Sequence, residues 1–141
     1  MIRFPFRSRQ VLFIIPVVIA IAATFLLVAW TRPVPRIVVE PQTQDLGEIP
    51  QQHLELTYTV RNEGKSSLHI EDVTTTCGCT QAAVDQATIP PGGSTLLRVT
   101  MDPQNDNLYG NLFRVITIRS NDPVAPEAKV DFHVSIPKPG G

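Results

Sequence analysis

The chain has 141 residues, of which 43% are hydrophobic and only 18% are charged, and its formal net charge at pH 7 is -1. This length accommodates one domain of about 100–150 residues and a short additional segment. The near-neutral charge excludes the strongly basic surface that nucleic-acid-binding domains usually carry. Since charged residues make up about 25% of an average soluble domain, an apolar segment must lower the fraction here.

That segment is residues 11–30, an apolar run without any charge and with Thr24 as its only hydroxyl. Twenty helical residues span about 30 Å, the thickness of the hydrocarbon core of a bilayer. We therefore predict a transmembrane helix over residues 11–30. Ala20-Ile21-Ala22 resembles a signal-peptide cleavage site. Cleavage there would leave eight mostly apolar residues at the new N-terminus, so we expect an uncleaved signal-anchor.

The orientation of this helix is predicted from its basic flanks. No acidic residue occurs in residues 1–10, and the arginines before and after the helix are Arg3, Arg7 and Arg9 against Arg32 and Arg36. Basic residues favour the cytoplasmic side of a membrane. We expect a cytoplasmic tail over residues 1–10 and a single pass through the inner or cell membrane. The C-terminal domain is then periplasmic or extracellular.

The chain beyond the helix is acidic. Residues 31–36 contain Pro33 and Pro35 and predict a short, stiff linker. Residues 37–141 hold 7 basic and 13 acidic residues, which gives a net charge of -6. This balance argues against contact with nucleic acid or anionic headgroups. The expected partners are the membrane, through residues 11–30, and a protein that the sequence does not identify.

Residues 37–136 show the alternation of apolar and polar side chains that is typical of β-strands. The clearest runs are Leu54–Arg61 and Ala128–Ile136, and the segment Phe113–Ile118, apolar on both faces, predicts a central strand. Shorter strands are expected at residues 37–39, 68–70 and 97–101. About seven short strands with turns between them predict an all-β, immunoglobulin-like β-sandwich. We expect residues 137–141, which read Pro-Lys-Pro-Gly-Gly, to be disordered.

The two cysteines of the chain, Cys77 and Cys79, are separated by one glycine. An exported domain permits a disulfide, and residues i and i+2 of an extended chain lie within its range. Because a three-residue ring contributes only about 1.6 kcal/mol, three interpretations stay open: a structural loop or disulfide, a redox thiol pair, and a copper(I) site built on soft thiolates. His69 is the candidate third copper ligand, with His133 and Met101 as alternatives.

Several short motifs occur in a specific order: Asp45-Leu46-Gly47-Glu48-Ile49, Asn62-Glu63-Gly64, Cys77-Gly78-Cys79-Thr80, Ile89-Pro90-Pro91-Gly92 and Ser120-Asn121-Asp122-Pro123. This order resembles the bacterial family known as domain of unknown function 1573 (DUF1573), whose members look like Hydin-type immunoglobulin-like domains. The resemblance implies an exported or membrane-anchored domain and no catalytic residues. Many such proteins are lipoproteins, but no cysteine directly follows the apolar segment here, so we expect the helix itself to be the anchor.

Each motif also has a structural interpretation. We expect Gly47, Asn62, Gly64, Gly92 and Asn121 to form turns, and Pro91-Gly92 to close a hairpin. No arrangement of catalytic residues is recognisable. The sequence therefore predicts a membrane-anchored, non-enzymatic module for protein contact or structure. The alternative is an extracytoplasmic redox or copper(I)-handling domain that uses the Cys-Gly-Cys motif.

Overall fold

The structure is a computed structural model, and it describes residues 19–20, 23 and 32–140. Residues 32–140 form strands, turns and loops without any helix. Nine strands occur in this part, two more than expected: β1 (Ile37–Glu40), β2 (Thr43–Glu48), β3 (Leu54–Asn62), β4 (Leu68–Thr75), β5 (Thr80–Val84), β6 (Thr88–Ile89), β7 (Ser94–Met101), β8 (Gly110–Ser120) and β9 (Glu127–Ile136).

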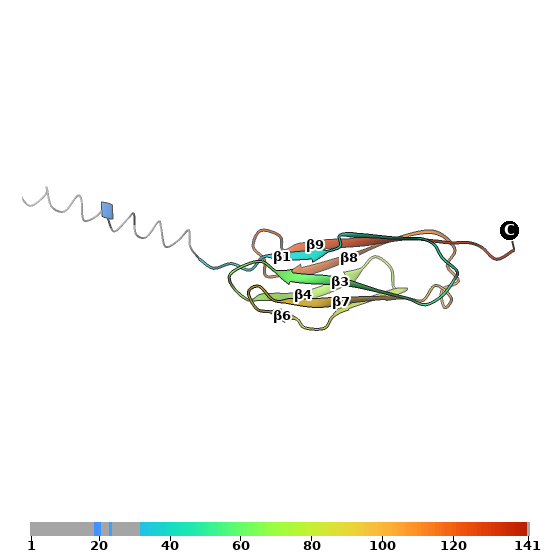
Figure 1. Cartoon of the computed structure of the whole chain (residues 1–141), viewed down its shortest axis with the longest axis horizontal. Helices are drawn as coiled ribbons and strands as arrows, with labels where there is room; N and C mark the ends of the chain where they lie inside the picture. Colours follow the sequence, from blue (N-terminus) through green and yellow to red (C-terminus); the bar gives the residue numbers. More distant parts are fainter. Residues whose placement is uncertain (1–18, 21–22, 24–31, 141) are drawn as a thin grey trace, which may run out of the picture. The chain divides into compact units, whose positions relative to one another are not determined.

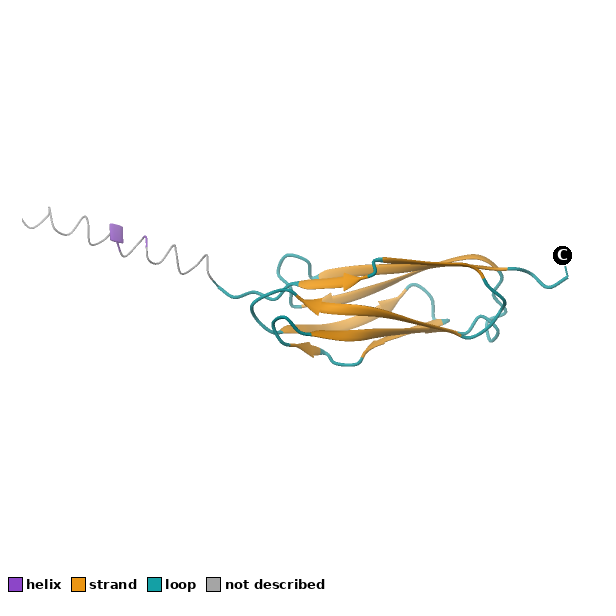
Figure 2. Cartoon of the chain, viewed as in Figure 1, coloured by secondary structure: helices purple, strands orange, loops and turns teal. Residues whose placement is uncertain are grey.

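The strands form two sheets that face each other (Figures 1 and 2). One sheet has the order β1-β3-β7-β5, and the other has the order β2-β9-β8-β4-β6. β2 runs parallel to β9, and the other paired strands are antiparallel. The all-β sandwich is confirmed, as is the central position of the strand that contains Phe113–Ile118. The expected hairpin at Pro91-Gly92 is wrong, because this turn connects β6 and β7, which belong to different sheets.

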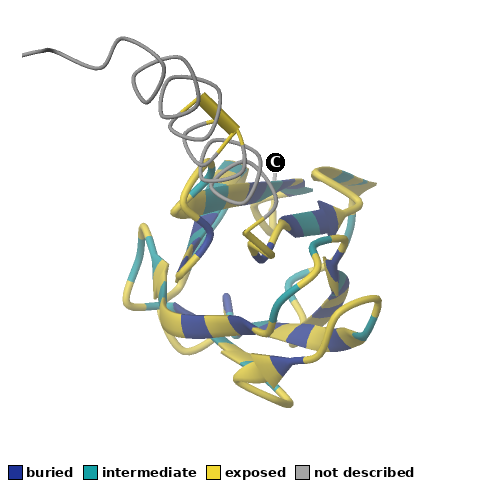
Figure 3. Cartoon of the chain, turned by 90° about the vertical axis from the view of Figure 1, so that its left-hand side faces the viewer, coloured by how far each residue is buried: buried dark blue, intermediate teal, exposed yellow. Residues whose placement is uncertain are grey.

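The core consists of the inward-facing residues of both sheets. Buried and exposed residues alternate along the strands, as Figure 3 shows for the sandwich. Tyr58 on β3 and Phe132 on β9 are its largest fully buried side chains. The Tyr58 hydroxyl donates a hydrogen bond of 3.0 Å to the carbonyl oxygen of Asp131, which ties the two sheets together. Burial and the charge of Asp131 raise the pKa of Tyr58 to about 12.

At one end of the sandwich, which we call the linker end, residues 33–36 and the loops at 62–67, 90–93 and 121–126 come together. Asn62 is the centre of this end and is only 1% exposed. Its Oδ1 accepts hydrogen bonds from the N–H groups of Gly64 at 2.9 Å and Arg36 at 3.2 Å. Its Nδ2 donates to the carbonyl oxygens of Ser66 at 2.7 Å and Ile89 at 3.0 Å. All four bonds that a buried amide side chain needs are therefore made.

Asp122 is the second buried polar residue at the linker end and is 2% exposed. One carboxylate oxygen accepts the N–H of Ile37 at 2.8 Å, and the other accepts those of Val124 at 2.8 Å and Ala125 at 3.1 Å. Burial pushes the pKa of Asp122 upward, but these three N–H groups and the charge of Arg36 outweigh it and hold the pKa below its usual value. The charged carboxylate of Asp122 therefore fixes the first residue of β1 by a hydrogen bond.

The predicted tail and transmembrane helix lie outside the described residues, apart from Ile19, Ala20 and Ala23, which are helical. Among the described residues no helix has the length and apolarity needed to cross a membrane. The predictions for residues 1–31 stay predictions. A separate compact unit begins at Pro33 and contains the whole sandwich.

Gly64 generates the first prediction. A Cβ atom at this position would overlap the backbone of Val34, Pro35 and Arg36. We expect Gly64→Ala to lower the free energy of unfolding by at least about 2 kcal/mol, because backbone cannot move aside as a flexible side chain can. Urea unfolding followed by circular dichroism measures this. Gly78→Ala is the matched control, since a Cβ there would meet open space; equal losses in the two variants would contradict the prediction.

Asp122 generates the second prediction. A carboxylate whose folded-state pKa is lowered stabilises the fold above the unfolded-state value, near 3.8, and loses that contribution as the pH falls through the folded-state pKa. We expect Asp122→Asn to lose about 2 kcal/mol at pH 7, because a charged acceptor is removed. The difference from the unsubstituted chain should shrink below pH 4. A difference that stays constant from pH 7 to pH 2 would show that the charge of Asp122 does not stabilise the fold.

Candidate functional site

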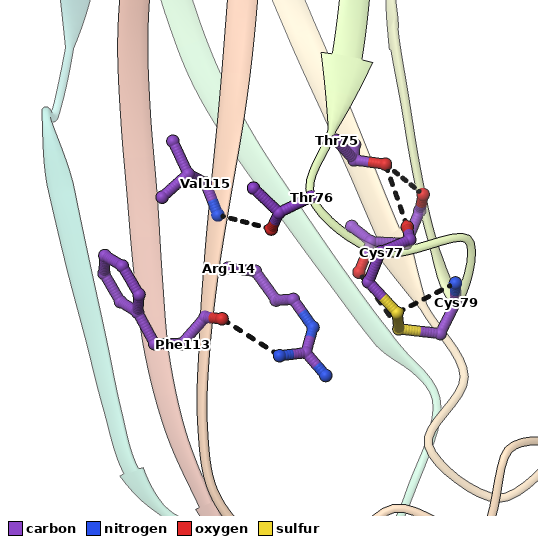
Figure 4. The surroundings of a disulfide bond; sticks show 8 residues. Thr75, Thr76, Cys77, Cys79, Phe113, Arg114 and Val115 are labelled. Atoms are coloured by element: carbon purple, nitrogen blue, oxygen red, sulfur yellow. Dashed lines mark hydrogen bonds between the residues drawn. A yellow bond between two sulfur atoms is a disulfide. The ribbon is translucent and has the colours of Figure 1, made fainter.

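The Cys-Gly-Cys motif lies in the short connection between β4 and β5, at the end of the sandwich opposite the linker. We call this the distal end; it contains residues 49–53, 76–80 and 102–109. Cys77 and Cys79 are joined by a disulfide, and their Cα atoms are 5.2 Å apart. Figure 4 shows the loop with its hydrogen bonds. The Thr75 hydroxyl lies 3.0 Å and 2.9 Å from the carbonyl oxygens of Cys77 and Thr80, which closes the loop at its base.

A β-bulge in β4 determines which way the cysteines face. The register of β4 against β8 shifts between Ile70 and Asp72. Ile70 is buried before the bulge, and Val73 and Thr75 are partly buried after it. Because a bulge adds one residue to a strand, it moves the following residues to the opposite face. Cys77 therefore continues the inward-facing row of Val73 and Thr75 instead of the outward-facing one.

Arg114 reaches the same region from β8. Its neighbours on the inner face, Ile116 and Ile118, are fully buried, and its partner on β9 is the fully buried Phe132. The side chain of Arg114 therefore begins on the inner face of the five-stranded sheet, and the residue is partly buried. Nη1 donates to the carbonyl oxygen of Phe113 at 2.9 Å, whereas Nε is buried and has no hydrogen-bond partner among the described residues.

The register brings Arg114 and Cys77 next to each other. β4 ends at Thr75, opposite Ile116. The N–H of Thr76 donates to the carbonyl oxygen of Val115, and the N–H of Val115 donates to the Thr76 hydroxyl. Continuing this pairing by one residue places Cys77 beside Arg114. Figure 4 shows the Arg114 side chain between β8 and the cysteine loop, with its guanidinium bonded to the Phe113 carbonyl oxygen.

A solvent-filled hollow of about 300 Å³ opens on the other side of the loop and includes Cys79. Its lining comes from the starts of β3 and β5, the end of β7 and the loop after it: His53, Gly78, Cys79, Gln81, Thr100, Asp102, Asn105 and Asp106. His53 lies 3.9 Å from Asp102 through Nδ1 and 3.6 Å from Glu55 through Nε2. These groups are largely exposed, so the pairs contribute little to stability. The carboxylates of Asp102 and Asp106 nevertheless make the wall of the hollow acidic.

The candidate copper ligands are not gathered around the cysteines. His69 is the second residue of β4, at the linker end, and its Nδ1 is 3.1 Å from the Thr88 hydroxyl oxygen. Thr75 follows His69 by six positions along the strand, at about 3.3 Å per position, so one ion cannot contact both His69 and Cys77. Met101 is buried in the core. In the described part of the chain, no three His, Cys, Asp or Glu residues form a metal-binding group.

A second hollow, of about 350 Å³, lies on the outer face of the five-stranded sheet. We call it the outer hollow; it is lined by Asp45, Gly47, Glu48, Asn111, Leu112, Phe113, His133, Val134 and Ser135. The Phe113 side chain is 51% exposed, and its ring centroid lies 4.6 Å from that of His133. His133 is therefore part of an aromatic pair beside two acidic residues, away from the cysteines.

The turn residues taken from the motifs have structural roles. Gly47 and Gly92 adopt positive φ angles of 63° and 74°, where residues with a Cβ are strained. The Asn121 side chain accepts the N–H of His69 at 2.8 Å and donates to the carbonyl oxygen of Ser67 at 3.3 Å. Gly47 lies inside β2, where the register against β9 shifts, so the turn expected at this position is wrong. Asn62, Gly64, Gly92 and Asn121 lie at the loops that join the ends of the strands.

Sequence reasoning identified the cysteine pair but not the residues around it. His53, Asp102 and Arg114 belong to β3, β7 and β8 or their ends, and only the fold brings them to the cysteine loop. One signal was present for Arg114. It stands in an otherwise apolar segment with Leu112, Ile116 and Ile118 at the same alternation, which indicates an arginine on an inward-facing position.

The two sheets and their strand order define the class of this domain, and solved structures agree. A protein of unknown function from Porphyromonas gingivalis W83 is 30% identical with a TM-score of 0.63, over 73% of this chain and 46% of that one. A PapD-like domain of human CEP192 is 11% identical with a TM-score of 0.56, over 77% and 91%. The VesB protease of Vibrio cholerae is 14% identical with a TM-score of 0.57, over 72% and 32%.

The domain is thus an immunoglobulin-like sandwich of the PapD-like kind. The family of proteins of unknown function DUF1573 matches residues 37–135, and the chain belongs to this family. A comparison with curated proteins finds no match. The chain spans less than half the length of the Porphyromonas protein and about a third of the VesB chain. At 14% identity, the likeness to a protease concerns the fold alone.

The small disulfide ring generates the third prediction. Closing three residues contributes at most about 1.6 kcal/mol by loop entropy. We expect the double substitution Cys77→Ser with Cys79→Ser to fold and to lose no more than a few degrees of melting temperature, because the sandwich has its own core. Thermal unfolding by circular dichroism measures this. A double variant that fails to fold would show that the disulfide is a structural requirement.

Proposed function

We propose that this protein is a membrane-anchored, extracytoplasmic module whose outer sheet face binds a partner protein by non-catalytic contact. The anchor is the apolar segment 11–30, and the sandwich is the binding part. Membership of a family of unknown function and PapD-like neighbours support a contact module, and they identify no substrate. The motif residues support it further, because Asn62, Gly64 and Asp122 are used to build the fold.

The observation that carries the proposal is the outer hollow. An aromatic ring that is half exposed is unusual on a polar sheet face, and such residues often contact partners. Asp45 and Glu48 stand beside it, and the domain carries a net charge of -6. The partner expected here is a protein segment that offers an apolar side chain to Phe113 and a basic side chain to the two carboxylates.

Photo-crosslinking tests the binding proposal in native cells. We expect a benzoylphenylalanine at position 113 of the full chain to form one discrete protein adduct, and Asp45→Lys with Glu48→Lys to reduce its yield at least about fivefold by charge repulsion. The matched control carries the same group at Leu96, which is 37% exposed on the four-stranded sheet. Adducts of equal yield at both positions, or no effect of the lysines, would contradict the assignment of the outer hollow.

The same cells test the anchor. Because a transmembrane helix stays in the bilayer when peripheral contacts are removed, we expect the full chain to remain with the membrane pellet after extraction at alkaline pH. Release into the supernatant would contradict the anchor while leaving the crosslinking result intact.

A further inference from the structure

The distal end holds a disulfide whose two sulfur atoms have different surroundings. Cys79 lines the solvent-filled hollow, and its sulfur lies 3.7 Å from the Thr80 hydroxyl. Cys77 continues the alternation that places Val73 and Thr75 on the inner face, and its sulfur accepts the N–H of Cys79 at 3.2 Å. A thiol from solvent can therefore approach Cys79, while a negative charge on Cys77 would meet a hydrogen-bond donor.

The partly buried side chain of Arg114 is the second component of this site. Nε of Arg114 is buried without an acceptor, and Arg114 forms no ion pair with any described residue. A buried donor without a partner destabilises the fold, and a charged one does so more strongly. Because Cys77 follows Thr76, which pairs with Val115, a thiolate on Cys77 would form on the side of the loop that faces Arg114, a cation without an ion-pair partner among the described residues. A nearby arginine stabilises a thiolate over a thiol.

From these observations we infer that Cys77 and Cys79 form a redox-active disulfide that oxidises the dithiol of a partner protein, and that Arg114 is the positioning residue that stabilises the Cys77 thiolate. This activity goes beyond the contact function proposed above and uses a different end of the sandwich. The small ring fits it, because a three-residue loop adds little to stability and therefore does not require a permanent bond.

The reaction is a thiol–disulfide exchange in two steps. A thiolate of the partner attacks the Cys79 sulfur, a mixed disulfide forms, and Cys77 leaves as a thiolate beside Arg114. The second partner thiolate then attacks the partner sulfur of the mixed disulfide and releases Cys79. The partner dithiol loses two electrons and two protons and becomes a disulfide. Cys77 and Cys79 gain the two electrons, and solvent exchanges the two protons.

The hollow beside Cys79 also restricts the charge of the partner segment that can approach the disulfide. Its wall carries Asp102 and Asp106, and His53 lies between Asp102 and Glu55. Acidic groups beside the attacked sulfur disfavour an acidic segment and favour a neutral or basic one. The substrate class is therefore a protein dithiol on an exposed segment without acidic neighbours.

Equilibration with glutathione tests the inference on the full chain in mild detergent. The chain is held in buffers of reduced and oxidised glutathione, quenched with acid, and labelled with a maleimide polymer so that reduced and oxidised forms separate on a gel. We expect the disulfide to reach equilibrium within the range of these buffers. Arg114→Met should shift the equilibrium constant about tenfold toward the disulfide, equal to about 30 mV for this two-electron couple.

Two variants separate charge from packing. Arg114→Lys keeps the positive charge and should stay within about threefold of the unsubstituted chain. Arg119→Met is the matched control: Arg119 lies on the same strand but on its outer face, 3.5 Å from Glu71, and this change should leave the equilibrium unchanged. A disulfide that resists reduction by the strongest glutathione buffer, or an Arg114→Met variant with an unchanged constant, would overturn the inference.

A second measurement covers the case in which Arg114→Met fails to fold. In Cys79→Ser, Cys77 is the remaining thiol, and its ionisation is followed by thiolate absorbance in the ultraviolet. We expect Cys77 to ionise clearly below the ordinary cysteine value of about 8.5, and Cys79 in the Cys77→Ser variant to ionise closer to it. Two cysteines that ionise together, or a Cys77 that ionises above about 8.5, would remove the role given to Arg114.

Discussion

The hydrogen bonds of the Asn62 side chain are the constraint on which the linker end depends. One buried amide joins the end of β3, the linker at Arg36, the turn at Ser66 and the carbonyl oxygen of Ile89 before the crossing to β7. Its own backbone N–H and carbonyl pair with the turn that contains Gly92. Because every donor and acceptor of this side chain is used, no other residue type can replace it without leaving a buried polar group unpaired.

The two ends of the sandwich differ in how their polar groups are used. At the linker end, Asn62 and Asp122 are buried and hydrogen-bonded to backbone groups, so they stabilise the fold. At the distal end, the Nε atom of Arg114 is buried with no hydrogen-bond partner in the described part of the chain, and the disulfide is partly exposed beside a hollow. Unsatisfied buried groups in a folded protein call for an explanation, and function is a common one. Because of this contrast, we propose the redox chemistry at the distal end.

Much of the fold was predictable, and the misses have physical causes. The alternation in Leu54–Asn62 and Glu127–Ile136 identifies β3 and β9, because each has one buried face. β2 was missed, since it lies at a sheet edge and most of its residues are exposed, so no apolar alternation marks it. β6 has only two residues, too few for any period. Of the candidate site, only the adjacent cysteines were visible, because the other members come from distant strands.

The sequence by itself determined the class of fold, the apolar segment before it and the pair of cysteines, because each depends on residues that are close together in the chain. The tertiary structure alone decided what surrounds the cysteines. The bulge after Ile70 turns Cys77 inward, and the pairing of β4 with β8 brings Arg114 beside it. A one-residue shift in register reverses the face of every following side chain, and no local pattern reports such a shift.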